Sequence, residues 1–239
     1  MLTLAIESTA VTASAALVRN GELIGEYTLN SAGTHSATLL PMAEDILKKS
    51  NTDIDDIDLF ACAAGPGSFT GVRIGAALIK GLAFAGEKPC VGVSSLEALA
   101  YNLSAHVGII CPVMNARRGQ VYTAIFSSDG SGNIQRLMAD SAIPTEELYP
   151  QLDLYKNDGL DIRFVGDGYS ITESYGAKPT PQRLRWQSAA SVAAVAERIY
   201  GETEDKSAFA PELLLPVYLR LPQAQREREE RLKNQNQQV

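Results

Sequence analysis

Apolar residues near the N-terminus form short runs separated by turn residues, which is the pattern of β-strands. We expect strands at Leu2–Glu7 and Ala13–Val18, followed by a third at Glu22–Leu29. The Asn20-Gly21 pair tolerates positive φ and is a strong signal for a two-residue hairpin turn. The chain is therefore predicted to open with a meander of three strands.

The spacing of apolar residues then changes to that of helices. Between Thr34 and Lys49 they recur at helical intervals, and two lysines end the segment where they complement the helix dipole. Pro41 is expected to kink this helix. The apolar run "IDLFACAA" predicts a buried strand, a glycine-rich loop follows it, and Thr70–Ala85 is predicted to be a second helix. The strand "PCVGV" and the helix "SSLEALAYNL" complete the unit.

The same order of elements recurs from Ile109 onward. Three strands, "IICPVMNA", "VYTAIFS" and "IQRLMADSAI", precede a helix that begins at Thr145, the strand "IRFVGDG" and an Ala-rich helix that ends at Gly201. This duplicated βββαβα order predicts an α/β protein of two lobes with a cleft between them. We assign residues 1–105 to an N-terminal lobe, 106–222 to a C-terminal lobe, and 223–239, which have almost no apolar side chains, to a charged polar tail.

Composition narrows the function classes. The chain has 239 residues, of which 45% are hydrophobic and 21% charged, as is ordinary for a soluble globular protein. Its net charge of −7 argues against a stand-alone nucleic-acid binder, because such proteins usually carry a basic face. The N-terminal apolar run is too short for a signal peptide, and no stretch has the length of a membrane helix, so we expect a cytoplasmic protein.

Metal and thiol chemistry find little support in the sequence. Cys62, Cys90 and Cys111 are widely spaced and each lies in an apolar run, which is typical of buried structural cysteines. His35 and His106 are far apart, and no two metal-type ligands have the close spacing of a zinc site. We expect no metal and no other cofactor.

The stretch "AGPGSFTGVRIG" at residues 64–75 permits two interpretations, of which the first is a phosphate site. Free backbone N–H groups at the start of the following helix could bind an anion. However, the spacing of Gly65, Gly67 and Gly71 matches neither the Walker loop nor the dinucleotide-binding fingerprint. A weaker nucleotide site stays open. Its candidate residues are Glu7, Ser8, Gly65, Gly67 and Ser68.

The second interpretation of the glycine loop is close packing. Gly71 and Gly75 lie four residues apart at the start of the predicted helix, and several small residues follow, so another backbone could approach closely. Apolar residues cover most of the helix circumference, which indicates burial on more than one side. One side would cover its own sheet, and the other would meet either the core of this chain or a partner subunit.

Several segments, taken in order and spacing, resemble the TsaB family, also called YeaZ. They are "AIESTA", "HSATLLPMAEDIL", "AGPGSFTGVRIG", "VGVSSLEALA", "NARRGQVYTA" and "PVYLR". The resemblance extends to about Leu221. It implies an actin-like or Hsp70-like ATPase fold of two lobes, each built on an RNase H-like mixed sheet with helices, in agreement with the duplicated pattern.

The resemblance also implies a function. Members of this family belong to the bacterial machinery that attaches a threonylcarbamoyl group to adenosine 37 of tRNAs that read ANN codons. The implied role is a non-catalytic scaffold and dimerisation subunit that activates the paralogous transferase TsaD, with the ATPase TsaE in the same complex. The chain would form a homodimer when alone and would reach tRNA only through the complex.

The family's partner interface lies on two helices of the first lobe. By position these are the helix around Ser36–Lys48 and the helix Gly71–Ala85. The residues expected to contact the partner are Leu39, Leu40, Ala43, Gly71, Val72, Arg73, Gly75, Ala76 and Ile79.

A metallopeptidase is one alternative, and it fails on its ligands. The transferase paralogue holds its metal with an H-x-x-x-H pair, whereas the position four residues after His35 is Leu39. The metal site of the paralogue is therefore not expected here.

An actin-like ATP-dependent enzyme, such as a small kinase, is the remaining alternative. In such enzymes an acidic residue ends the first strand of each lobe. Glu7 fulfils this in the first lobe, but Asn115 stands at the corresponding place in the second and is a far weaker base than a carboxylate. The Gly-Asp-Gly sequence at 166–168 is interpreted as a turn at the end of a strand rather than as part of a nucleotide site.

Overall fold

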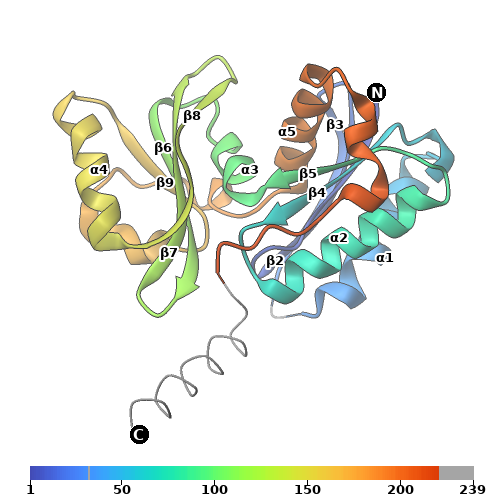
Figure 1. Cartoon of the computed structure of the whole chain (residues 1–239), viewed down its shortest axis with the longest axis horizontal. Coiled ribbons are helices and arrows are strands. Elements are labelled where there is room, and N and C mark those ends of the chain that lie inside the picture. Colours follow the sequence, from blue (N-terminus) through green and yellow to red (C-terminus); the bar gives the residue numbers. More distant parts are fainter. Residues whose placement is uncertain (32, 221–239) are drawn as a thin grey trace, which may run out of the picture.

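The computed structural model describes residues 1–31 and 33–220. The predicted tail, 223–239, lies outside the described residues. Two lobes lie side by side, and each is built on one mixed β-sheet (Figure 1). The predicted two-lobed α/β fold is confirmed.

The first lobe contains a five-stranded sheet in the order β3-β2-β1-β4-β5. Its elements are β1 (Leu2–Glu7), β2 (Thr12–Arg19), β3 (Glu22–Asn30), α1 (His35–Lys49), β4 (Leu59–Gly65), α2 (Phe69–Phe84), β5 (Cys90–Ser94) and α3 (Ser95–Tyr101), with a 3₁₀ turn at Ile54–Asp56. The first three strands pair antiparallel as the predicted meander, and Asn20 and Gly21 both adopt positive φ in the hairpin turn. β4 pairs parallel to β1 and to β5.

The second lobe contains a four-stranded sheet in the order β8-β7-β6-β9. Its elements are β6 (Val107–Arg117), β7 (Gln120–Asp129), β8 (Ile134–Pro144), α4 (Thr145–Asn157) and β9 (Ile162–Val165). The remaining elements are α5 (Ala189–Glu202) and 3₁₀ helices at Tyr169–Tyr175, Gln182–Leu184, Lys206–Phe209 and Pro211–Leu213. The three strands of the second meander again pair antiparallel, and β9 pairs parallel to β6.

Helix α5 packs on the first sheet, although the sequence analysis included it in the range 106–222 of the second lobe. One face of that sheet carries small residues, among them Ala5, Ala16 and Ala61, and the Ala-rich helix is buried against them. Small side chains on both surfaces allow the helix to approach the sheet closely. The chain therefore returns to the first lobe after it has built the second.

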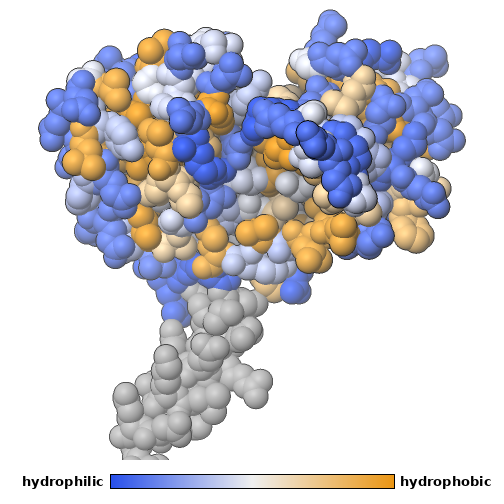
Figure 2. Space-filling view, turned by 45° about the horizontal axis from the view of Figure 1, so that its top comes forward, coloured by the Kyte–Doolittle hydropathy of each residue, from blue (hydrophilic) through white to orange (hydrophobic). Residues whose placement is uncertain are grey.

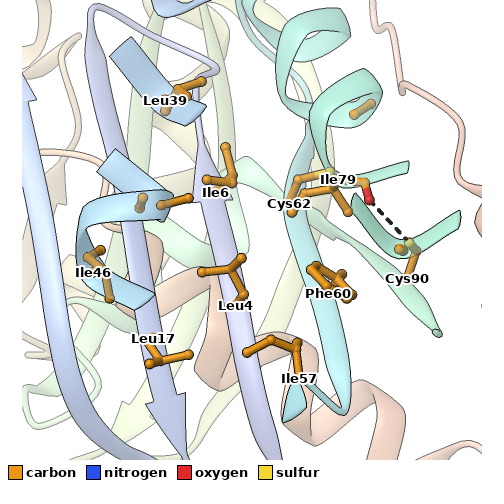
Figure 3. Packing of buried hydrophobic residues seen from close by; sticks show 14 of the residues in the cluster. Leu4, Ile6, Leu17, Leu39, Ile46, Ile57, Phe60, Cys62, Ile79 and Cys90 are labelled. Carbon is orange, nitrogen blue, oxygen red and sulfur yellow. Dashed lines mark hydrogen bonds between the residues drawn. The ribbon is translucent and has the colours of Figure 1, made fainter. Parts of the chain in front are cut away.

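Helices α1 and α2 cover the opposite face of the first sheet. Figure 3 shows Leu4 and Ile6 of β1 between residues of both helices, including Ile46 of α1 and Ile79 of α2. The first sheet is thus covered on both faces by helices that are distant in sequence.

The cysteines are structural, as predicted. All three are free and buried. Burial raises the pKa of the Cys90 and Cys111 thiols to about 12, and it raises the pKa of the Cys62 thiol as well. A thiol with so high a pKa is not a nucleophile at neutral pH. Within the described residues, the helices are too short or too polar to span a lipid bilayer.

Candidate functional site

The glycine loop and the first turns of α2 pack directly on the end of β1. A Cβ added at Gly67 would lie 2.4 Å from the carbonyl oxygen of Thr9, and one at Gly71 would lie 2.0 Å from that of Ser8. At Gly75 it would lie 2.4 Å from the Ser8 hydroxyl oxygen. That hydroxyl donates a hydrogen bond to the Gly71 carbonyl at 2.9 Å. The glycines are therefore needed for contacts within this chain.

The predicted partner contacts are mostly internal, and this corrects the sequence interpretation. Seven of the nine expected residues are buried in the first lobe: Leu39, Ala43, Gly71, Val72, Gly75, Ala76 and Ile79. Leu40 and Arg73 are exposed. The reason is geometric, because the glycine side of α2 is the side that must approach β1. The spacing of the glycines correctly predicts which side of α2 another backbone approaches, but it does not show that this backbone is the end of β1 in the same chain.

A second strip of small residues lies on the outer side of α2. Ala77, Gly81 and Ala85 are exposed at intervals of four, and a Cβ added at Gly81 would meet no atom within 4 Å. Ile74 and Leu78 beside them are only half-buried. Figure 2 shows hydrophobic residues along the lower edge of the lobe that carries this helix. We call Ile74, Ala77, Leu78, Gly81, Leu82 and Ala85 the outer strip.

The segment 214–220, here called the strap, crosses from the first lobe to the second (Figure 1). Leu214 is buried in the core of the first lobe. The Val217 N–H donates to the Ala64 carbonyl at 2.7 Å, and a Cβ at Gly65 would lie 2.3 Å from the Val217 carbonyl oxygen. Arg220 donates to the Ala116 carbonyl in the second lobe. The strap therefore covers the glycine loop and joins the lobes.

A cleft of about 630 Å³ lies between the lobes beside the strap. Of the predicted nucleotide residues, Gly67 and Ser68 line this cleft. Glu7 and Ser8 are buried, and Gly65 lies beneath the strap. The Ser68 hydroxyl accepts a hydrogen bond from the Gly71 N–H at 3.3 Å, so it already caps α2.

Two carboxyl groups lie where the lobes meet, Glu7 buried and Asp167 half-buried. Glu7 is 1% exposed, and its Oε1 accepts hydrogen bonds from the Thr9 N–H and hydroxyl, both at 2.6 Å. Burial raises the pKa of Glu7 to about 7; hydrogen bonds from Thr9 and Ser8 oppose the increase, and the Asp167 charge adds to it. Burial also raises the pKa of Asp167, whose Oδ1 has no hydrogen-bond partner among the described residues.

Asp167 lies in the Gly-Asp-Gly sequence that the sequence analysis interpreted as a turn at the end of a strand, and its charge acts on Glu7. The acidic partner of Glu7 was sought at Asn115, but the Asn115 side chain accepts a hydrogen bond from the Arg117 N–H at 2.8 Å within the β6–β7 turn. The signal was the Gly-Asp-Gly sequence after β9. A Cβ at Gly166 would lie 2.1 Å from the Val113 carbonyl oxygen, so this turn packs tightly on β6.

The described residues contain no group of three or more His, Cys, Asp or Glu side chains placed to hold a metal ion. The raised pKa of Glu7 means that this buried carboxyl holds its proton to a higher pH than a free glutamate does.

Comparisons with known proteins point to proteins of tRNA threonylcarbamoyladenosine biosynthesis. The family whose model matches residues 23–227 is "TsaD: tRNA N6-adenosine threonylcarbamoyltransferase". The chain is similar to the tRNA threonylcarbamoyladenosine biosynthesis protein TsaB of Bacillus subtilis, with 34% identity over 171 residues, which are 72% of this chain and 73% of the relative. The Escherichia coli protein of the same name is 32% identical over 178 residues, 74% of this chain and 75% of the relative.

A solved structure, YeaZ from Pseudomonas aeruginosa, matches the fold. Its TM-score is 0.75 with 26% identity, and the match covers 91% of this chain and 99% of that one. The alternative of an ATP-dependent enzyme is not favoured by the curated relatives.

Proposed function

Because the chain belongs to the TsaB family of tRNA threonylcarbamoyladenosine biosynthesis proteins, we propose that it serves this pathway as a non-catalytic subunit that binds and activates the transferase TsaD. The role in the pathway follows from the family. The scaffold role, the docking surface and the further partners are the proposal.

The outer strip of α2 is the observation that supports a docking role. Its small residues leave room for a second backbone, and the half-buried Ile74 and Leu78 lose further contact with water when a partner covers them. Helix α1 lies against α2 and adds the exposed side chain of Leu40. The proposed interface therefore lies on α1 and α2, as expected from the sequence, but on the outer side of α2 rather than on its glycine side.

The inner side of α2 supports the non-catalytic part of the proposal. The loop that most resembles a phosphate-binding loop is occupied by the chain itself, because Ser8, Thr9 and Val217 fill the space over its glycines. Backbone groups committed to internal packing are not free to hold a nucleotide phosphate. The ATPase TsaE and the tRNA would join through the complex, and a second copy would use the same outer strip when TsaD is absent, which gives a two-fold dimer.

Gly81→Leu tests the docking surface. The new side chain points into open space, so the variant should fold with unchanged or slightly higher stability, since glycine is a poor helix residue. It should obstruct close helix packing and weaken TsaD binding by at least about tenfold. Gly201→Leu is the matched control, because Gly201 is also helical, exposed and without a neighbour within 4 Å.

Thermal unfolding and size-exclusion chromatography with purified TsaD measure the two effects. Co-elution of the Gly81→Leu variant with TsaD at wild-type affinity would remove the outer strip from the interface. If both variants lose co-elution with TsaD, the outer strip is also removed from the interface, because the control substitution lies outside the strip.

A further inference from the structure

Arg117 and Arg220 line the cleft, and Arg73 and Arg118 adjoin its lining residues, although the chain carries a net charge of −7. Arg117 and Arg118 are exposed in the β6–β7 turn, Arg73 is exposed on the first turns of α2, and Arg220 lies in the strap. Among the described residues that line the cleft, Asp167 is the acidic one, and it lies largely buried. The mouth of the cleft is therefore locally basic.

An aromatic stack adjoins these arginines. The Arg73 guanidinium lies 3.8 Å above the centroid of the Phe69 ring, and the Phe69 and Tyr218 ring centroids are 4.7 Å apart. Arg73 Nε donates to the Tyr218 hydroxyl at 2.8 Å, which fixes the arrangement. Tyr218 is 39% exposed, so part of the stack is open to solvent. Aromatic rings and guanidinium planes are the surfaces on which unpaired RNA bases stack.

The β6–β7 turn holds its arginines in an unfavourable backbone conformation. Arg117 has a φ of 64° and Arg118 a φ of 55°, and Gly119 follows with a φ of 73°. Glycine and asparagine adopt this left-handed conformation readily, whereas arginine does so at a cost. Strained residues of this kind indicate a function for the side chains.

We propose that Phe69, Arg73, Arg117, Arg118 and Tyr218, which we call the arginine rim, contact tRNA directly. The arginines would bind phosphates, and the Phe69–Tyr218 stack would receive an unpaired base of a loop. The rim lies at the N-terminal end of α2, and Arg73 continues the i, i+4 series of the outer strip. RNA on the rim would therefore extend toward the proposed TsaD interface. This inference rests on the proposed function, and it replaces the expectation that tRNA is reached only through the complex.

The double variant Arg117→Gly/Arg118→Gly separates a role in the shape of the turn from a role of the arginine side chains in binding phosphate. Glycine relieves the positive φ at both positions, so the thermal unfolding temperature should stay equal or rise. If the side chains bind phosphate, affinity for tRNA should fall at least tenfold, and the slope of log affinity against log salt should become shallower by about 2. Arg19→Gln/Arg183→Gln is the charge-matched control, because both arginines are exposed elsewhere on the molecule.

Fluorescence anisotropy of labelled tRNA with the full chain in complex with TsaD provides the readout, and size exclusion reports complex formation for each variant. Weaker tRNA binding by the rim variant alone, with the complex intact, supports the inference. Unchanged tRNA affinity overturns it and leaves the proposed function standing. Loss of the TsaD complex in the rim variant also overturns it, because the rim would then face an acidic protein surface. If the wild-type chain forms no complex with TsaD but binds tRNA through the rim, the proposed function fails and this inference holds.

Discussion

Ser8 leaves no room for a side chain at two positions of α2, and both positions are glycines. Its carbonyl oxygen occupies the space beside Gly71, and its hydroxyl oxygen occupies the space beside Gly75. The same hydroxyl donates to the Gly71 carbonyl. One buried serine at the end of β1 thus fixes how close α2 lies, and each contact can be tested by adding a single methyl group.

Gly71→Ala should destabilise the protein by about 1–3 kcal/mol, because its Cβ would lie 2.0 Å from a backbone oxygen that cannot move away alone. Gly81→Ala in the same helix has open space and should stabilise it by up to ~1 kcal/mol. Urea unfolding of the two variants measures the difference. Equal stabilities would show that α2 does not pack on Ser8 as described.

The buried carboxyl of Glu7 makes stability depend on pH. Its pKa is raised from 4.5 to about 7 in the folded protein, so the folded state binds the proton more tightly than the unfolded chain does. Stability from this group is therefore present at low pH and decreases as pH rises from about 4.5 to about 7, by an amount on the order of 3 kcal/mol. Burial of Asp167 acts in the same direction.

Glu7→Gln should remove part of this pH dependence, because glutamine keeps an acceptor for Thr9 and does not titrate. Denaturant unfolding at pH 5 and pH 8 should show a smaller loss of stability in the variant than in the wild type. An identical loss in both proteins would mean that Glu7 is already ionised throughout this range.

At the level of elements, the sequence predicts what is local and fails where distant segments meet. The strands and the positions of α1 and α2 could be predicted, because alternation and helical spacing are properties of neighbouring residues. The side of α2 that faces β1 could not, since Ser8 is more than sixty residues away from Gly71 along the chain. The packing of α5 on the first sheet and the course of the strap were missed for the same reason. The Asp167 turn was recognised as a turn, but its approach to Glu7 was not expected, because the two residues are far apart along the chain.

Gly65→Ala tests the strap. The added methyl group would collide with the Val217 carbonyl at a φ of 115°, so the strap must move away from β4. The Val217 N–H, which is bonded to the Ala64 carbonyl, should then exchange with deuterium much faster than in the wild type. Gly132→Ala is the control, since its φ of 98° is also positive but no atom lies within 4 Å. Unchanged protection at Val217 in the Gly65 variant would contradict the close contact.

At the scale of the molecule, the strap joins the two lobes, and a cleft of about 630 Å³ lies beside it. The strap bonds Ala64 of the first lobe to Ala116 of the second through Val217 and Arg220, and the Asp167 charge adds to the raised pKa of the buried Glu7 carboxyl. Outside the cleft, the outer strip and the arginine rim are the surfaces that we propose for partners. This arrangement suits a protein that acts through others.

The isolated chain should therefore transfer no threonylcarbamoyl group to tRNA, and activity should appear when TsaD and TsaE are added. Incorporation of a labelled threonylcarbamoyl group into tRNA measures this. Omission of TsaD from the otherwise complete mixture is the control. Transfer by the chain alone would show that its own cleft retains a catalytic centre.

The return of α5 to the first sheet bears on how the chain folds as it leaves the ribosome. One face of the first sheet lacks its main cover until α5, which ends at Glu202, has been synthesised, whereas β6 to β9 form one continuous stretch that can pair as soon as it emerges. The earliest-made segment is thus the last to be completed during translation. Until then the alanine-lined face of the first sheet lacks the α5 residues that bury it in the finished protein.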